Sequence, residues 1–331
     1  MSFRALVTQA PIYGRTISTV QTLDESRLPE GEVTVDVEWA GFNYKDGLCL
    51  MGEGGLVRSF PHVAGIDFAG TVRRSDDGRY TAEDKVVLTG WRVGETHWGG
   101  FSERARVKAD WLVPLPEGLS TRDAMAVGTA GLTAMLAIDR LEGMGLSPQS
   151  GEVLVTGAAG GVGSIAVMLL ARLGYKVAAL SGRPQHGDML RELGATSIVD
   201  RAEFLAQPDK PLESARFAAA IDSVGGDVLG KLLRQIRYGG SVASIGNAAG
   251  IALNTNVLPF ILRGVNLLGI DSVMQPFAAR VAAWQRLAGL FDMGVYRSNI
   301  EEVGLADLPE KAAEILQGEV RGRVLVNPHL E

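Results

Sequence analysis

The chain has 331 residues, and 42 of them are glycine, about one in eight against a usual share of about 7%. Hydrophobic residues make up 46%, which is enough for a packed core, and the 13 prolines without a Gly-X-Y period exclude a collagen-like or disordered chain. The net charge of −6 argues against a nucleic-acid-binding surface, the single cysteine, Cys49, excludes an internal disulfide, and the length predicts two domains.

The first 122 residues favour β-structure, because short alternating runs are separated by Gly, Asp and Pro. We predict strands over 3–9, 32–41, 63–72, 85–90 and 105–116. Helical periodicity is scarce here, so we expect a mainly antiparallel, barrel-like β domain. The N-terminal segment MSFRALVTQAP lacks the apolar core of a signal peptide, and no run reaches about 18 apolar residues, so we expect a cytoplasmic protein without a membrane span.

From about residue 123 the pattern changes to alternating strands and helices, after a first helix for which Thr121 or Asp123 is available as the N-cap. We predict strands over 152–157, 176–182, 197–200, 217–224, 241–246 and 265–271, and helices over 162–174, 188–194, 226–237 and about 277–293. This alternation predicts a parallel, doubly wound Rossmann sheet, that is, an α/β fold. A last strand over 322–328 suits the β domain. We therefore expect a catalytic domain of residues 1–122, completed by 294–331, and a nucleotide-binding domain of residues 123–293.

The strongest local signal is the glycine-rich loop VTGAAGGVG, residues 155–163. It joins a predicted strand to a predicted helix, which is the context that a dinucleotide-binding fingerprint requires. Glycine lets backbone N–H groups approach a pyrophosphate, and the N-terminus of the following helix adds partial positive charge. We expect Ala159, Gly160, Gly161 and Val162 to bind the cofactor; an ordinary strand–helix turn is the alternative.

The end of the second strand of this domain selects the type of dinucleotide. An NAD site usually places an acidic residue there, about 20 residues on, where it bonds to the ribose 2′-hydroxyl. Here Ser181, Gly182 and Arg183 stand at this place, without an acid. A hydroxyl and a guanidinium suit a 2′-phosphate, because arginine forms charge-assisted bonds to phosphate. We predict NADPH as the cofactor, against the alternative that Arg183 is an ordinary solvated side chain.

Six segments spread over the chain carry a resemblance to a known family: GFNYKDGL (41–48), HVAGIDFAG (62–70), GGFSE (99–103), VGTAGLTA (127–134), VTGAAGGVG (155–163) and GRVLV (322–326). Together they resemble the medium-chain dehydrogenase/reductase superfamily, which implies a Rossmann sheet inserted in a GroES-like domain. Zinc-dependent members carry a cysteine in the first segment and Gly-His-Glu in the second. This chain has Asn43 and Gly65-Ile66-Asp67 there, so it resembles the zinc-free branch and we expect no metal.

Within that branch, the segments NYKDGL, HVAGID, SGR and LLGIDSV (267–273) resemble the quinone-oxidoreductase-like acryloyl-CoA (acrylyl-CoA) reductases. The resemblance implies NADPH-dependent reduction of the double bond of acryloyl-CoA to propionyl-CoA, with hydride at the β-carbon and a proton at the α-carbon. The expected partner is therefore a small CoA thioester rather than nucleic acid or a membrane. Two alternatives stay open: a reductase of quinones or small enones, and a nucleotide-binding homologue without turnover.

The resemblance implies Asn43, Tyr44 and Asp67 as catalytic residues. Reduction of an α,β-unsaturated thioester develops an enolate, which needs preorganised donors and then an acid. Asn43 offers an amide, Tyr44 a phenol and Asp67 a carboxylate within an apolar strand. Each has a structural alternative, since an asparagine can cap a turn, a tyrosine ring can simply pack, and a buried carboxylate needs a partner in any case.

Further cofactor contacts are implied at the carboxyl ends of the strands, where open α/β sheets bind ligands. They are Thr129, Thr133, Ser223, Gly246, Asn247, Ile270, Ser272 and Arg323. The strands predicted over 241–246 and 265–271 come late in the nucleotide-binding sheet, and an edge strand invites pairing with a second chain. Because relatives commonly dimerise there, we expect a homodimer.

Overall fold

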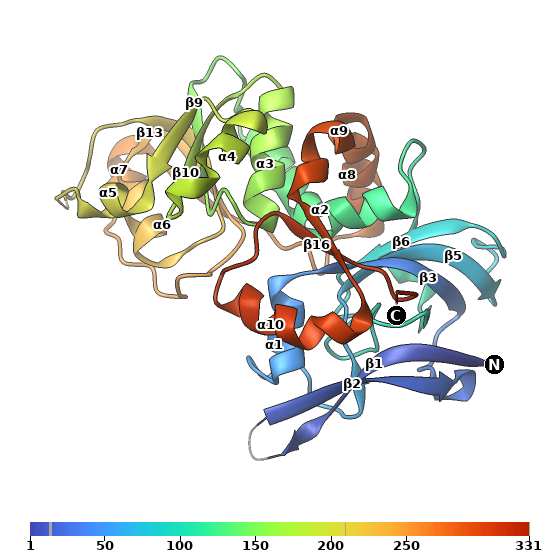
Figure 1. The fold of residues 1–331 in the computed structure, drawn as a ribbon. Coiled ribbons are helices and arrows are strands. Elements are labelled where there is room, and N and C mark those ends of the chain that lie inside the picture. The colour runs from blue at the N-terminus through green and yellow to red at the C-terminus, as the bar shows by residue number, and fades with distance from the viewer. Residues whose placement is uncertain (13–14, 209, 331) are drawn as a thin grey trace. The chain divides into compact units, whose positions relative to one another are not determined.

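The computed structural model describes residues 1–12, 15–208 and 210–330 (Figure 1). Its contacts divide the chain into two compact units, each described here by itself. The first comprises Met1–Thr129, Ser272–Gly289 and Arg297–Glu331, and the second Ala130–Asp271 and Leu290–Tyr296. Residues 272–289 therefore pack with the β-rich unit, although we expected this stretch in the nucleotide-binding domain. The assignment of catalysis and cofactor binding to residues 1–122 with 294–331 and to 123–293 stays a prediction.

The first unit is built on two β-sheets. Their strands are β1 (Ser2–Ile12), β2 (Arg15–Asp24), β3 (Val33–Phe42), β4 (His62–Val63), β5 (Asp67–Ser75), β6 (Lys85–Thr89), β7 (Arg104–Val107), β8 (Leu112–Pro114), β15 (Ile300–Val303) and β16 (Arg323–Val326). The larger sheet has the order β15-β16-β3-β5-β6-β8, with β7 also on β3, and the smaller has the order β2-β1-β4. Apart from the parallel pair β15–β16, the pairings are antiparallel, as we predicted.

Two predicted strands of this unit are interrupted. The run 63–72 breaks between β4 and β5, because Gly65 has a φ of +107°, outside the range of a β-strand. Only glycine fits there, since a Cβ would lie 2.6 Å from the backbone nitrogen of Phe101. The run 105–116 breaks into β7 and β8 around a short 3₁₀ helix, η2 (Ala109–Trp111). The first break matters most, since it makes Asp67 the first residue of β5 and not an interior one.

Among the helices of the first unit, α8 (Phe277–Leu290) confirms the helix predicted over about 277–293, whereas α1 (Tyr44–Met51) and α10 (Leu308–Leu316) were missed from the sequence. The unit also has the 3₁₀ turns η1 (Glu25–Arg27), η4 (Arg297–Asn299) and η5 (Leu305–Asp307). Figure 1 shows α1 and α10 side by side, and a Cβ on Gly47 of α1 would lie 2.7 Å from Cγ2 of Ile315. This close packing anchors the helix that follows Asn43.

The long helix α2 (Thr121–Gly143) is not regular. Gly128 has φ 50° and ψ −158°, values outside the helical range, and the helix kinks there. By length and hydropathy, α2 alone among the described helices could cross a membrane, yet 78% of its apolar window is buried inside the protein. Burial of this kind is typical of a core helix.

The second unit confirms the predicted α/β class. Its parallel sheet has the order β11-β10-β9-β12-β13-β14, and Figure 1 shows helices on both faces. The strands are β9 (Glu152–Thr156), β10 (Lys176–Ser181), β11 (Ser197–Asp200), β12 (Phe217–Asp222), β13 (Ile236–Ser244) and β14 (Asn266–Gly269). The helices are α3 (Gly161–Arg172), α4 (Gly187–Glu192), α5 (Arg201–Ala206), α6 (Gly226–Leu233), α7 (Leu258–Arg263) and α9 (Met293–Tyr296), with the 3₁₀ turn η3 (Pro184–His186).

Candidate active site

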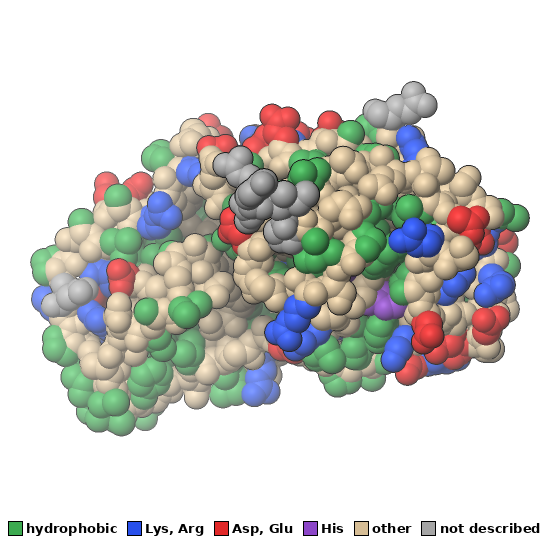
Figure 2. Space-filling view, turned by 90° about the horizontal axis from the view of Figure 1, so that it is seen from below, with side chains coloured by type: hydrophobic (Ala, Val, Ile, Leu, Met, Phe, Trp, Pro, Cys, Tyr) green, Lys and Arg blue, Asp and Glu red, His purple; other side chains and the backbone are tan. Residues whose placement is uncertain are grey.

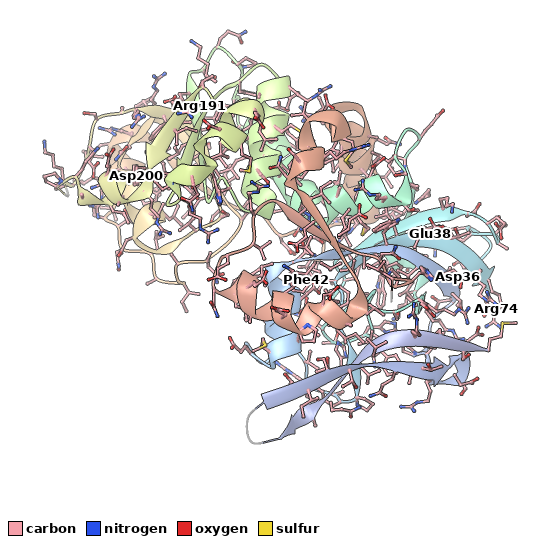
Figure 3. The ribbon with its side chains drawn as sticks, in the orientation of Figure 1. Asp36, Glu38, Phe42, Arg74, Arg191 and Asp200 are labelled. Carbon is pink, nitrogen blue, oxygen red and sulfur yellow. The ribbon has the colours of Figure 1, made fainter. Side chains whose placement is uncertain are left out.

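Asn43 lies where β3 passes into α1, directly after Phe42, which Figure 3 labels at the end of β3. Its backbone N–H donates to Oδ2 of Asp46 at 2.9 Å, which caps the first turn of α1. Its side-chain amide instead reaches across the sheet, because Nδ2 donates to Oδ1 of Asp67 at 2.7 Å and Oδ1 accepts from Nη1 of Arg323 at 2.9 Å. The asparagine therefore both begins a helix and joins a carboxylate to a guanidinium.

Asp67 is fully buried at the start of β5. Besides the amide of Asn43, it accepts the backbone N–H of Thr129 on Oδ2 at 2.6 Å, and Nη2 of Arg323 lies 3.9 Å from the same oxygen. Burial raises the pKa of Asp67, whereas the guanidinium of Arg323 and the two hydrogen bonds act against this rise. The glycines at 41 and 128 permit this approach, since a Cβ on either would lie 2.7 Å or less from an Asp67 oxygen.

Arg323, the first residue of β16, is buried beside Asp67. Its guanidinium also donates to the carbonyls of Phe42, Met125 and Ala126. In a regular helix, the Met125 carbonyl would accept the N–H of Thr129, and the kink at Gly128 frees both groups. Asp67 then takes the freed N–H while Arg323 donates to the freed carbonyl. These bonds hold Arg323 in the protein, and the predicted contact of Arg323 with the cofactor stays a prediction.

Asp46 is a second buried carboxylate that the sequence did not single out as functional. It accepts from the backbone N–H of Ile66 at 2.9 Å as well as from Asn43. Burial, reinforced by the nearby charge of Asp67, raises the pKa of Asp46 to about 7. Asn43, Asp46, Asp67 and Arg323 thus form one polar cluster, called the buried cluster below, which fixes the ends of β3, β5 and β16 and the start of α1.

Tyr44 differs from the other two residues predicted to be catalytic. It begins α1, and its side chain is 44% exposed. Next to it, Lys45 pairs with Glu95 at 2.9 Å, and Cys49 is buried, which raises the pKa of its thiol well above the ordinary value. Because both amide hydrogens of Asn43 face carboxylates, the phenol of Tyr44 is the predicted catalytic group that this loop presents to solvent.

In the second unit, the glycine-rich loop forms the predicted cradle. Gly157 follows β9 with a φ of +59°, Gly160 is the N-cap of α3, and a Cβ on Gly163 would lie 2.3 Å from the Gly157 carbonyl oxygen. Ala159, Gly160, Gly161 and Val162 therefore lie around the N-terminus of α3, with Ala159 buried and the other three half-buried. The loop geometry fits the pyrophosphate of a dinucleotide.

Predicted residues from two further strands lie against this loop. Ser223, after β12, donates its hydroxyl to the Thr156 carbonyl at 2.9 Å, and a Cβ on Gly157 would lie 2.4 Å from that hydroxyl oxygen. Gly246 follows β13, and a Cβ there would lie 2.7 Å from the Ser223 carbonyl oxygen; Asn247 is exposed beside it. The structure thus brings these residues together at the carboxyl edge of the sheet.

The end of β10 carries the residues predicted to select NADPH. Ser181 is buried and its hydroxyl oxygen accepts the backbone N–H of Arg183 at 3.1 Å, while Arg183 is half-buried. Asp200, labelled in Figure 3, pairs with Ser181 across β10 and β11 and directly precedes Arg201. The Arg201 guanidinium lies over Gly182, where a Cβ would come within 2.7 Å of its Cζ. Sequence reasoning missed Arg201, because only the pairing of β11 with β10 brings it here.

The other predicted cofactor residues lie apart from the glycine-rich loop in the chain. Thr129 is half-buried and Thr133 is buried, both on α2. Ile270 follows β14 and donates its N–H to the Ser244 carbonyl at 3.1 Å, and Ser272 is half-buried two residues further on. A contact of any of these four residues with a cofactor stays a prediction.

Comparison with known proteins identifies the family. Residues 29–117 match the family model of the alcohol dehydrogenase GroES-like domain, and residues 161–288 match that of zinc-binding dehydrogenases. The chain belongs to the medium-chain dehydrogenase/reductase superfamily. It is 59% identical to the acrylyl-CoA reductase AcuI of Ruegeria pomeroyi over 95% of both chains, and 45% identical to the putative quinone oxidoreductase YhfP of Bacillus subtilis over 93% of both.

A solved structure is similar over nearly the whole length. The YhdH oxidoreductase of Salmonella enterica, determined in complex with NADP, superposes with a TM-score of 0.95 at 54% identity and covers 99% of both chains. The fold of this superfamily member is thus shared with a protein that holds a dinucleotide.

Zinc-dependent members of the superfamily need a donor set that this chain does not offer. At the two places where they carry ligands, Asn43 is engaged by Asp67 and Arg323 and Ile66 is apolar. No three His, Cys, Asp or Glu side chains gather into a metal site within the described residues. These residues do not fit zinc, so the chemistry proposed below contains no zinc-dependent step.

Proposed function

We propose that the chain is an NADPH-dependent reductase of acryloyl-CoA, which it converts to propionyl-CoA. The observation that carries this proposal is the 59% identity, over 95% of both chains, to a protein named acrylyl-CoA reductase. The glycine cradle and the arginines at the end of β10 support a dinucleotide with a 2′-phosphate, and the related YhdH structure contains NADP.

Bound NADPH supplies a hydride for the β-carbon of the thioester. Ala159, Gly160, Gly161 and Val162 would hold its pyrophosphate, and Ser181 with Arg183 and Arg201 its 2′-phosphate. The remaining cofactor contacts would come from residues that follow β12, β13 and β14, whose carboxyl ends lie at the same edge of the sheet: Ser223, Gly246, Asn247, Ile270 and Ser272. Tyr44 is the donor that we assign to the developing enolate or to the proton for the α-carbon. Asn43 and Asp67 act through position, because their polar atoms bond to one another inside the buried cluster.

The test of this function is NADPH oxidation with acryloyl-CoA, crotonyl-CoA and a simple quinone in parallel. We expect acryloyl-CoA to be turned over most efficiently and Tyr44→Phe to lower kcat about 100-fold, the lower end of the usual contribution of a positioned proton donor. Tyr238→Phe, which changes an 84% exposed tyrosine of the second unit, is the matched control and leaves kcat unchanged. Efficient turnover of the quinone with none of acryloyl-CoA would overturn the proposal and favour the activity named for the Bacillus subtilis relative.

A homodimer and a cytoplasmic location complete the proposal. β14 is the edge strand of the parallel sheet, and several large apolar side chains of the stretch 251–267, which leads into this strand, are exposed: Ile251, Val257, Ile261, Leu262 and Leu267. Hydrophobic side chains also gather at the left end of Figure 2, the end at which Figure 1 labels α7. An exposed apolar edge of this kind favours pairing with a second copy. The lone cysteine suits the reducing cytoplasm.

Ile261→Lys should turn the dimer into a monomer in sedimentation-equilibrium experiments, because it places a charge where an apolar side chain is 68% exposed in a single chain. Ile17→Lys is the matched control, since Ile17 is 53% exposed on β2 of the other unit and the variant should remain dimeric. A wild-type chain that sediments as a monomer would contradict the proposed dimer.

A further inference from the structure

Residues 270–276 connect β14 to α8 without belonging to a helix or strand. Such a segment has no regular ladder of backbone hydrogen bonds, so side chains that bond to its carbonyls set its conformation. Two of its residues, Ile270 and Ser272, are predicted cofactor contacts. They follow β14, which lies on the other side of β9 from β10, the strand assigned to the adenosine half, so we assign them to the nicotinamide end. The groups that hold this segment therefore bear on how the cofactor is held.

Arg280 on α8 is one of the largest fully buried side chains. Its Nη2 donates to the carbonyls of Ser272 at 3.1 Å and Val273 at 2.6 Å, and its Nε donates to the carbonyl of Gln275 at 3.0 Å. A single guanidinium thus bonds to three carbonyls within four consecutive residues. Few arrangements other than a planar fork of N–H groups can do this.

The other edge of the same guanidinium is fixed to β6. Nη1 donates to the carbonyl of Thr89 at 2.7 Å and to its hydroxyl at 3.0 Å, and Cζ lies 4.8 Å from the centre of the Trp91 ring. The backbone N–H of Trp91 in turn donates to the Val273 carbonyl at 2.9 Å. Segment 272–275 is therefore held on two sides, by Arg280 and by the turn after β6.

The turn after β6 has a backbone that only its surroundings can maintain. Gly90, Trp91 and Arg92 all have positive φ, at 79°, 57° and 58°, and two of these residues are not glycine. A Cβ on Gly90 would lie 2.7 Å from the Val273 carbonyl oxygen and 2.8 Å from Nη2 of Arg280. A buried guanidinium stabilises a core less than an apolar side chain of similar size does. Its presence here therefore indicates that the backbone conformation of the segment that Arg280 holds matters for function.

We propose that Arg280 is a positioning residue, which fixes segment 270–275 so that the backbone around Ile270 and Ser272 holds the nicotinamide half of NADPH. This inference rests on the proposed use of NADPH. It assigns Arg280 no contact with the cofactor, and it separates the two ends of the site: Arg183 and Arg201 select the adenosine half, and Arg280 prepares the backbone for the other half.

The test compares two ligands, NADPH and 2′,5′-ADP, which keeps the 2′-phosphate but lacks the nicotinamide. Calorimetric titration of Arg280→Met should show NADPH binding weakened about tenfold or more, with 2′,5′-ADP affinity changed less than about twofold. Arg280→Lys keeps the charge but not the fork, so it should show the same selective loss in smaller degree, and it serves as the folded variant if the methionine variant proves unstable. Arg263→Met is the matched control, because Arg263 also donates to backbone carbonyls, those of Arg234 and Ile236, and should change neither affinity.

Equal weakening of both ligands in Arg280→Lys would show a general structural role and overturn the inference, as would unchanged NADPH binding in both variants. Wild-type chain that binds NADPH but does not turn over acryloyl-CoA would refute the proposed substrate and leave this inference standing. Wild-type chain that fails to bind NADPH would refute the cofactor on which both rest.

Discussion

Replacing Arg183 by alanine is expected to weaken NADPH binding about 10- to 100-fold and to leave NADH binding unchanged. A hydrogen bond to a charged group contributes more than a neutral one, and the 2′-phosphate that would accept it is present in NADPH only. Arg183 is half-buried at the end of β10, and its backbone N–H donates to the hydroxyl oxygen of Ser181. This bond fixes the backbone from which the arginine side chain extends. Titration of the wild type and the variant with each cofactor, by fluorescence or calorimetry, measures the two dissociation constants and their ratio.

Arg201→Ala provides an independent arm of this prediction, because its guanidinium lies over Gly182 beside the same strand end. Like Arg183→Ala, this variant should weaken NADPH binding and leave NADH binding unchanged. The double variant should bind both cofactors about equally. Arg191→Ala is the matched control, since that exposed arginine of α4 pairs with Asp188 on the surface. Equal losses for NADPH and NADH in Arg183→Ala would show that the end of β10 is not the phosphate site.

Features with local signals were predictable from the sequence. Their signals depend on neighbouring residues only: the glycine-rich loop, the alternating strands and helices, and the acid-free end of β10. The structure has a glycine cradle at the loop and two arginines, Arg183 and Arg201, at the end of β10. Helix α1 was missed although a signal exists. Asn43 followed three residues later by Asp46 is a polar pair at capping-box spacing, and the backbone N–H of Asn43 does bond to that carboxylate.

Features made by long-range contacts were not predictable. Arg201 is 19 residues from Gly182 and Arg280 is at least 5 residues from the carbonyls to which it donates, and nothing in their neighbouring sequence distinguishes them from surface arginines. The kink at Gly128 likewise has no signal in the sequence, because an isolated glycine within a helical pattern is tolerated and does not by itself indicate a kink. Only the approach of Asp67 and Arg323 shows why the helix breaks there and why Asn43 directs its amide inward.

The same contacts predict that Arg323→Met will cost about 3–5 kcal/mol of unfolding free energy, the usual effect of removing one partner of a buried ion pair. The variant leaves the carboxylate of Asp67 without a cation and the carbonyls of Met125 and Ala126 without their donor. Denaturant unfolding measures the loss. Arg172→Met, which removes a surface pair with Asp292, is the control and should cost about 0–1 kcal/mol.

The loss in Arg323→Met should depend on pH in a defined direction. Burial already raises the pKa of Asp67, and removal of the guanidinium that opposes this rise moves the pKa higher still. Between the pKa of the unfolded chain, about 4, and that of the folded variant, the folded state binds a proton that the unfolded state has released. The wild-type pKa of Asp67 is itself raised, so the unfolding free energy of the variant falls relative to wild type as pH rises from the folded-state pKa of the wild type to the higher one of the variant. In acid, where Asp67 is protonated in both proteins, the two curves run parallel.

The double variant Asp67→Asn/Arg323→Met isolates the charge from the geometry. If the buried charge is the main cost, the double variant is more stable at pH 8 than Arg323→Met and loses the added pH dependence, because no group at position 67 ionises. If the double variant is instead as unstable as the sum of the single variants, and Arg323→Met runs parallel to wild type at every pH, the two residues do not act as a pair. The kink at Gly128 would then need another explanation, since we attribute it to the bonds of Asp67 to the Thr129 N–H and of Arg323 to the Met125 carbonyl.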